Sequence, residues 1–109
     1  MINQLRFEYA TGEAAIATTI APNSQQFRVL EVRVHLSDAG GAGDLTLTVD
    51  AAQGAAYDTV IKTQDMTLVT DFTEQPTTPY YFDAGDKLVI AWANAGEVTY
   101  GLTVIYEVF

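Results

Sequence analysis

Residues 98–108 read VTYGLTVIYEV and carry the strongest structural signal in the chain. Every second position is apolar or aromatic, namely Val98, Tyr100, Leu102, Val104, Tyr106 and Val108. The positions between them are mostly small or polar, with Ile105 as the exception. Because successive side chains of a β-strand point to opposite faces, this period of two predicts a long strand with one buried face.

The same period recurs along the rest of the chain, and no long stretch has a helical period. The other predicted strands cover residues 5–9, 14–20, 26–37, 45–49, 57–63, 66–73 and 87–93. In the strand over 66–73, we expect Met66, Leu68 and Phe72 to share one side. Residues 80–82 form an aromatic edge or crossing segment, which follows a loop bracketed by Pro76 and Pro79.

Residues 26–37 contain a change of parity. Phe27 and Val29 fall on one face, whereas Leu30, Val32 and the later apolar residues fall on the other. A shift of one residue moves every later side chain to the opposite face unless an extra residue is inserted. The pattern therefore predicts a β-bulge near Val29.

About eight strands at this spacing are typical of an all-β fold, an antiparallel β-sandwich. We expect a jelly-roll-like arrangement, with an immunoglobulin-like sandwich as the alternative, because alternation leaves the strand order open. The length of 109 residues suits one hydrophobic core. Residues 1–109 are therefore predicted to form a single domain.

The composition disfavours several classes of protein. Without cysteine, the chain has no disulfide framework, thiolate nucleophile or cysteine-based zinc site. Five Lys and Arg face fourteen Asp and Glu, which gives a net charge of −9. Such a chain is unsuited to gripping nucleic-acid phosphates or anionic membranes, so we expect neither as a partner. No targeting or membrane-spanning segment is predicted.

The single histidine lies on a polar strand face. His35 shares this face with Glu31, Arg33 and Ser37, but Asp38 projects to the opposite face. A catalytic triad needs a carboxylate to orient the histidine and an oxyanion hole as well. We interpret the face as solvated or as part of an interface, and we expect no catalytic residue and no enzyme.

Four carboxylates lie in turns, at Asp38 and Asp44 around a glycine-rich loop and at Asp83 and Asp86 around Gly85. Neither pair has the spacing of a calcium loop, although calcium remains an alternative. Asp is an ordinary turn former, and the glycine loop lacks the following Lys-Ser/Thr of a phosphate cradle. We predict no metal and no cofactor.

Aromatic side chains suggest either a sugar platform or a protein interface. Tyr80, Tyr81 and Trp92 are the residues that would stack on a saccharide. Neighbours on a strand point to opposite faces, so one of the two tyrosines is expected to face outward. Exposed tyrosine is typical of protein interfaces.

Residues 82–90 (FDAGDKLVI) resemble the x-x-G-D-x-L-x-I turn and strand of many viral and secreted jelly-roll sandwiches. Three further stretches contribute to a wider resemblance, namely residues 32–41 (VRVHLSDAGG), 92–94 (WAN) and 99–102 (TYGL). Over residues 26–108, the chain resembles small tailed-bacteriophage virion proteins of the capsid decoration or head-fibre type.

This resemblance implies a non-enzymatic structural protein of the virion, made in the host cytoplasm. Such a protein would bind the major capsid protein or other virion proteins through symmetric contacts, as a homo-oligomer with a trimer favoured. The alternative is a carbohydrate- or receptor-binding module of a phage fibre or tail. The candidate interface residues are Tyr80, Tyr81, Val60, Val69, Val89, Ile105 and Phe109.

Overall fold

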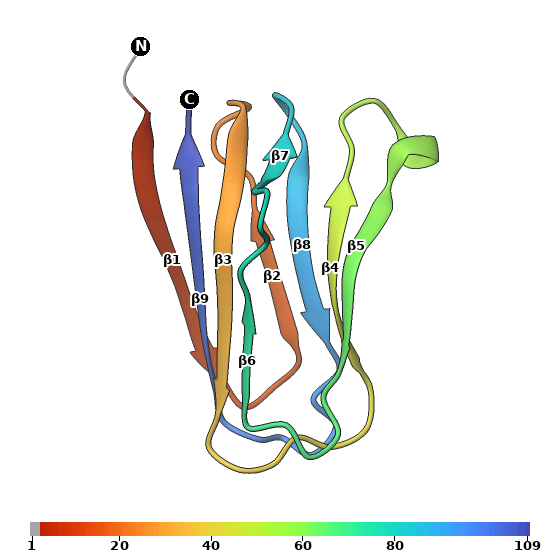
Figure 1. Cartoon of the computed structure of the whole chain (residues 1–109). Helices are drawn as coiled ribbons and strands as arrows, with labels where there is room; N and C mark the ends of the chain where they lie inside the picture. Colours follow the sequence, from red (N-terminus) through yellow and green to blue (C-terminus); the bar gives the residue numbers. More distant parts are fainter. Residues whose placement is uncertain (1–2) are drawn as a thin grey trace.

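Strand β9 (Tyr100–Val108) lies between two neighbours, β1 (Gln4–Gly12) and β3 (Phe27–Leu36), in an antiparallel sheet (Figure 1). The computed structural model describes residues 3–109. All the even-numbered side chains of β9 are buried, from Tyr100 to Val108. The predicted alternation of residues 98–108 is therefore confirmed over β9.

Two sheets stack to form the sandwich. In the first, β3 pairs with β7 along its first half and with β6 along its second half, so β6 and β7 share one position. The second has the order β2-β8-β4-β5. These strands are β2 (Ile16–Ile20), β4 (Asp44–Asp50), β5 (Thr59–Asp65), β6 (Asp71–Glu74), β7 (Tyr80–Phe82) and β8 (Lys87–Trp92).

The strand order identifies the sandwich as a jelly roll. The first strand pairs with the last, β2 with β8, β3 with β6 and β7, and β4 with β5. This nested pairing is the double Greek key of a jelly roll. The jelly-roll prediction is confirmed, and the immunoglobulin-like alternative does not describe the chain. No helix within residues 3–109 is long and apolar enough to cross a membrane.

The core lies between the facing sheets. Phe27 stacks on Phe82 with ring centroids 4.5 Å apart, and Tyr106 meets Phe27 edge-on at 6.1 Å. Leu45, Leu47 and Leu88 of the second sheet are fully buried and belong to the same hydrophobic core as these aromatic residues. Burial of this apolar surface is the main favourable term in folding.

The predicted bulge lies in β3. Val29 is opposite Tyr106 of β9, but Glu31 is opposite Ile105, so Leu30 is the extra residue. Phe27 and Val29 are buried before it, and Val32 and the later apolar residues are buried after it. One inserted residue thus keeps both halves of β3 facing the core.

The predicted strand over residues 66–73 is wrong in its first half. Met66 is fully buried, but Leu68 has φ 64° and is 80% exposed. The segment is a turn that pairs with the glycine-rich loop: Gly40 donates to the Val69 carbonyl and Leu68 donates to the Gly40 carbonyl. Likewise Tyr57 lies in a short 3₁₀ helix (Ala55–Tyr57) rather than in a strand.

Gly40 is required for this contact, because a Cβ there would lie 2.3 Å from the Met66 carbonyl oxygen. We expect Gly40→Ala to lower the free energy of unfolding by about 2–3 kcal/mol, as overpacking does. Gly41 is the matched control, since nothing lies within 4 Å of its Cβ position. Gly41→Ala should change stability by less than about 1 kcal/mol in urea unfolding. Equal effects of the two variants would contradict this packing.

Asn94 joins two loops at one end of the sandwich. It is 2% exposed, and its Nδ2 donates to the carbonyls of Glu13, Ala14 and Val98 at 3.2, 2.9 and 2.9 Å. Its Oδ1 accepts a hydrogen bond from the Val98 amide at 3.0 Å. The side chain therefore ties the β1–β2 connection to the β8–β9 connection.

Replacing the Asn94 amide by a carboxylate is a sharp test of this tie. Asn94→Asp removes the donor group and places a carboxylate oxygen against three carbonyls, so we expect a loss of about 3 kcal/mol in unfolding free energy at pH 7. Lowering the pH should recover part of the loss, since a protonated carboxyl donates again. A pH-independent effect would contradict the proposed hydrogen bonding.

Candidate protein-binding surfaces

Large apolar side chains stand on the outer face of the first sheet. We define the apolar stripe as Leu5, Phe7 and Tyr9 of β1 together with Ile105 of β9. The three β1 side chains are 52%, 49% and 70% exposed, and Ile105 lies opposite Phe7. The rings of Phe7 and Tyr9 are nearly parallel, with centroids 6.4 Å apart. The stripe is thus a flat apolar surface on a strongly acidic protein.

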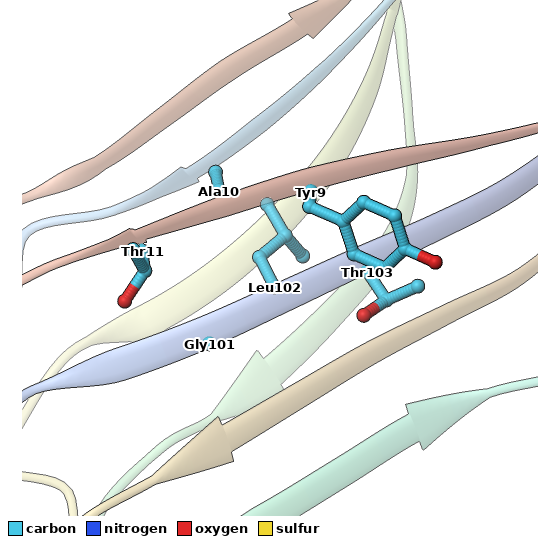
Figure 2. Close-up of a pocket in the computed structure, with 6 residues that line it drawn as sticks. All are labelled: Tyr9, Ala10, Thr11, Gly101, Leu102 and Thr103. Carbon is cyan, nitrogen blue, oxygen red and sulfur yellow. The ribbon is translucent and has the colours of Figure 1, made fainter.

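An open groove of about 340 Å³ lies at one end of this stripe (Figure 2). Its lining residues come from β1 and β9, namely Tyr9, Ala10, Thr11, Gly101, Leu102 and Thr103. Gly101, which lies opposite Thr11, has open space where a side chain would lie. The groove is therefore a hollow in a flat sheet surface, with Tyr9 beside it.

A polar strip on β3 borders the stripe. Arg33 forms an ion pair with Glu31, and His35 Nδ1 lies 2.6 Å from Asp71 Oδ1 of β6. The predicted polar face of β3 is confirmed. The carboxylate beside His35 is Asp71 rather than a neighbour in sequence. The His35 and Asp71 side chains are both about 70% exposed, with values of 73% and 70%, so they form a solvated surface pair.

A second surface lies at the end of the sheet where β9 finishes. We define the end cluster as Arg28, Tyr81, Glu107 and Phe109. Arg28 donates to Glu107 Oε1 at 2.7 Å and to the Tyr81 hydroxyl at 3.4 Å, and its guanidinium lies over the Phe109 ring. The Tyr81 hydroxyl and the Glu107 carboxylate raise the pKa of Arg28 above its ordinary value. An open hollow of about 540 Å³ adjoins Tyr81 and Phe109.

The seven residues predicted for an interface fall at separate places. Tyr81 and Phe109 come together in the end cluster, with ring centroids 6.5 Å apart. Val60 and Val89 lie in one row on the outer face of the second sheet, where each is opposite Thr48. Ile105 belongs to the apolar stripe.

The two remaining residues, Tyr80 and Val69, pack against the core. The Tyr80 hydroxyl donates to Glu74 at 3.4 Å, and burial followed by the Glu74 charge raises the pKa of Tyr80. Tyr80 and Val69 therefore expose less surface to a partner than Tyr81 does. Tyr81 is 60% exposed, which confirms the prediction that one of the two adjacent tyrosines faces outward.

Sequence reasoning missed Leu5, Phe7 and Tyr9 as surface residues. Their alternation with Gln4, Arg6 and Glu8 places them on one face of the strand, which in an ordinary amphipathic strand is the buried face. Pairing with β9 decides the face: Phe7 lies opposite Ile105, so the three apolar side chains share the outer face of the sheet, away from the second sheet. Alternation identifies residues that share a face, but it does not identify which face is covered.

The sugar platform of Tyr80, Tyr81 and Trp92 is not formed. Trp92 is 2% exposed in the core, and Tyr80 is half-buried. Trp92 Nε1 has no hydrogen-bond partner among residues 3–109 and lies 3.6 Å from the position of a Cβ on Gly43. Trp92 is a core residue because it shares the inward face of β8 with Leu88 and Ile90.

The turn carboxylates accept backbone hydrogen bonds, as ordinary turn chemistry predicts. Asp86 accepts from the amides of Ala52 and Asp83, and Asp38 accepts from Ala39. Asp83 accepts from Gln26 Nε2 and from the Ala84 amide, and these two bonds lower the pKa of Asp83. Over the described part of the chain, no three His, Asp or Glu side chains cluster as metal ligands would.

The fold of this chain is similar to that of a solved structure. No family model and no curated protein matches the sequence. A chain of the acidic stable capsid of Helicobacter pylori bacteriophage KHP30 has the same fold, with a TM-score of 0.54 and 15% identity over 99% of this chain and 94% of that chain. At this identity the likeness concerns the fold alone: the chain has a fold found in a phage capsid.

Two weaker likenesses have TM-scores of 0.45 and 0.36. The first is to the mitogen derived from Yersinia pseudotuberculosis, with 16% identity over 99% of this chain and 88% of that chain. The second is to a chain of the virus-like particle of the extra small virus of the prawn Macrobrachium rosenbergii, with 9% identity over 99% and 80%.

The lowered pKa of Asp83 gives a pH dependence. A carboxyl whose pKa is lower in the folded state stabilises the folded protein at every pH above its unfolded pKa, which is about 4 for Asp. This stabilisation is lost as the pH falls through the pKa of the folded state. We expect Gln26→Ala to remove part of this dependence, because the Gln26 hydrogen bond is its largest cause. Urea unfolding at pH 7, 4 and 3 measures it. Identical pH slopes for both proteins would contradict the assignment.

Proposed function

We propose that this chain is a non-enzymatic structural protein of a phage virion, which decorates the capsid and stabilises the shell by protein–protein contacts. Its partners are the major capsid protein or other virion proteins, and copies of the chain associate with one another. The observation that carries the proposal is the exposure of large apolar side chains on flat strand surfaces, the apolar stripe above all.

Several features support this reading. Large contiguous apolar patches on a protein surface mark interaction sites, whereas single exposed apolar residues are ordinary. A net charge of −9 disfavours DNA as the partner of such a surface. The jelly roll also occurs in viral capsid domains, and the fold likeness to a phage capsid chain agrees with that class.

The mechanism we propose is mechanical. Each copy bridges neighbouring capsid subunits and buries apolar surface, which contributes about 25 cal/mol per Å² removed from water. Many equivalent contacts on one shell multiply a modest single affinity. The end cluster suits the shell contact, because Tyr81 and Phe109 present aromatic surface and Arg28 and Glu107 add polar groups at its rim.

The alternative, a carbohydrate- or receptor-binding module, has less support. Of the three aromatic residues that would have formed its platform, Trp92 is in the core and Tyr80 is half-buried, which leaves Tyr81 exposed. Saccharide binding is therefore an outcome that the following experiment separates from shell binding.

The test is co-sedimentation of purified protein with expanded capsids, together with the temperature at which those capsids disassemble. We expect the protein to sediment with capsids and to raise that temperature. Tyr81→Ser should weaken binding by at least about 10-fold, as loss of an aromatic interface anchor does. Migration with tails alone, or binding to glycans without capsid binding, would refute the proposal.

Tyr57→Ser is the matched control. Tyr57 is 64% exposed, close to the 60% of Tyr81, but it lies in the 3₁₀ helix between β4 and β5 and is not a member of the end cluster. This variant should bind capsids as the unmodified protein does. Equal weakening by both substitutions would show that the end cluster is not the contact surface.

A further inference from the structure

Strand β1 has one unpaired edge. It is nine residues long, it ends the order β1-β9-β3-β6, and its one pairing partner within residues 3–109 is β9 (Figure 1). An unpaired edge presents a row of backbone donors and acceptors to any other strand. Natural proteins guard such edges with proline, bulges, short strands or inward-pointing charges. The sequence QLRFEYATG has no proline and pairs with β9 without a bulge, so a strand that pairs with this edge must match the charges of Arg6 and Glu8.

The polarity of β1 is reversed relative to its neighbour. Phe7 points outward with Ile105, whereas Arg6 and Glu8 lie on the face of Tyr106 and Val104, which are buried. Charged side chains thus occupy the core-side face of β1, and apolar side chains occupy the solvent side. Arg6 donates to the neutral amide oxygen of Gln4 at 2.7 and 3.1 Å, so its charge is not matched by that contact.

We propose that a second copy of this chain adds its β1 antiparallel to β1 of the first, about a two-fold axis that passes beside Phe7. In this register Phe7 is opposite Phe7 of the second copy, and Leu5 is opposite Tyr9. On the other face, Arg6 is opposite Glu8 of the second copy, twice by symmetry. The two first sheets become one continuous sheet, and the two apolar stripes become one surface.

Charge fixes this register. Sliding one copy by two residues brings Arg6 opposite Arg6 in one direction and Glu8 opposite Glu8 in the other, and like charges directly opposite destabilise a strand pair. Sliding by one residue places apolar side chains opposite charged ones. Because each copy carries a charge of −9, association needs a local attraction, which the two Arg6–Glu8 pairs supply.

The pairing deepens the proposed function, on whose self-association it rests, and it is two-fold rather than the trimer that the family resemblance implies. Purified protein without capsids tests it. A failure of strand pairing and a failure of shell attachment are therefore separate results.

The experiment measures mass by sedimentation equilibrium between about 1 and 100 μM. We expect the unmodified protein to reach twice its single-chain mass of 11.8 kDa. Arg6→Glu or Glu8→Arg alone should weaken dimerisation by at least about 10-fold, because each creates two like-charge pairs. An equimolar mixture of the two variants should form a heterodimer, since every facing pair is then of opposite charge.

Lys87→Glu is the control for net charge, because Lys87 is exposed on β8 of the other sheet. The dissociation constant of its dimer should be within about 3-fold of that of the unmodified protein. A monomer at all concentrations, a trimer, or a dimer that the β1 charges do not affect would overturn the proposal.

Cysteine cross-linking measures the register directly, and the chain has no cysteine of its own to interfere. Phe7→Cys should form a disulfide between two copies under mild oxidation, because the two positions face each other across the axis. Leu5→Cys alone should not, whereas a mixture of Leu5→Cys and Tyr9→Cys should. Efficient cross-linking of Leu5→Cys to itself would overturn the register.

Discussion

The burial of one face of β9 between two sheets is the constraint on which the rest of the molecule depends. Five consecutive even-numbered residues, from Tyr100 to Val108, lie in the core, and both edges of the strand are paired. β1 is held in place by this one neighbour, and β3 keeps its register against β9 through the bulge at Leu30. The outer surfaces are therefore presented by a rigid central strand.

Alternation made most of the fold predictable, including the bulge, because side chains on a strand report their face in every second residue. It failed at residues 66–69, where the glycine loop at Gly40 captures the chain as a turn. It also failed at β1. A sequence pattern separates Phe7 from Arg6 and Glu8, but the pairing register with β9, which places Phe7 on the outer face beside Ile105, is a property of the tertiary structure.

The candidate surfaces share one physical feature, which is apolar or aromatic area on flat strands. Tyr81 and Phe109 meet through residues far apart in sequence, so pairing of β7 with β3 was needed to bring them together. Tyr80, the neighbour of Tyr81 in sequence, instead packs against the core and donates to Glu74. The stripe and the end cluster adjoin on the outer face of one sheet, where Leu5 lies opposite Glu107. The unpaired edge of β1 lies on the other side of the stripe, so this edge is available for self-association while the end cluster contacts a different protein.

The central claim is that the outer edge of this sheet is covered in the working protein, and amide hydrogen exchange along β1 tests it most directly. If β1 is an interface, the amides at its outer edge exchange quickly in dilute protein and become protected as the protein concentration rises, while β9 stays protected throughout. Rapid exchange of the β1 edge at every concentration, and on assembled particles too, would contradict the account.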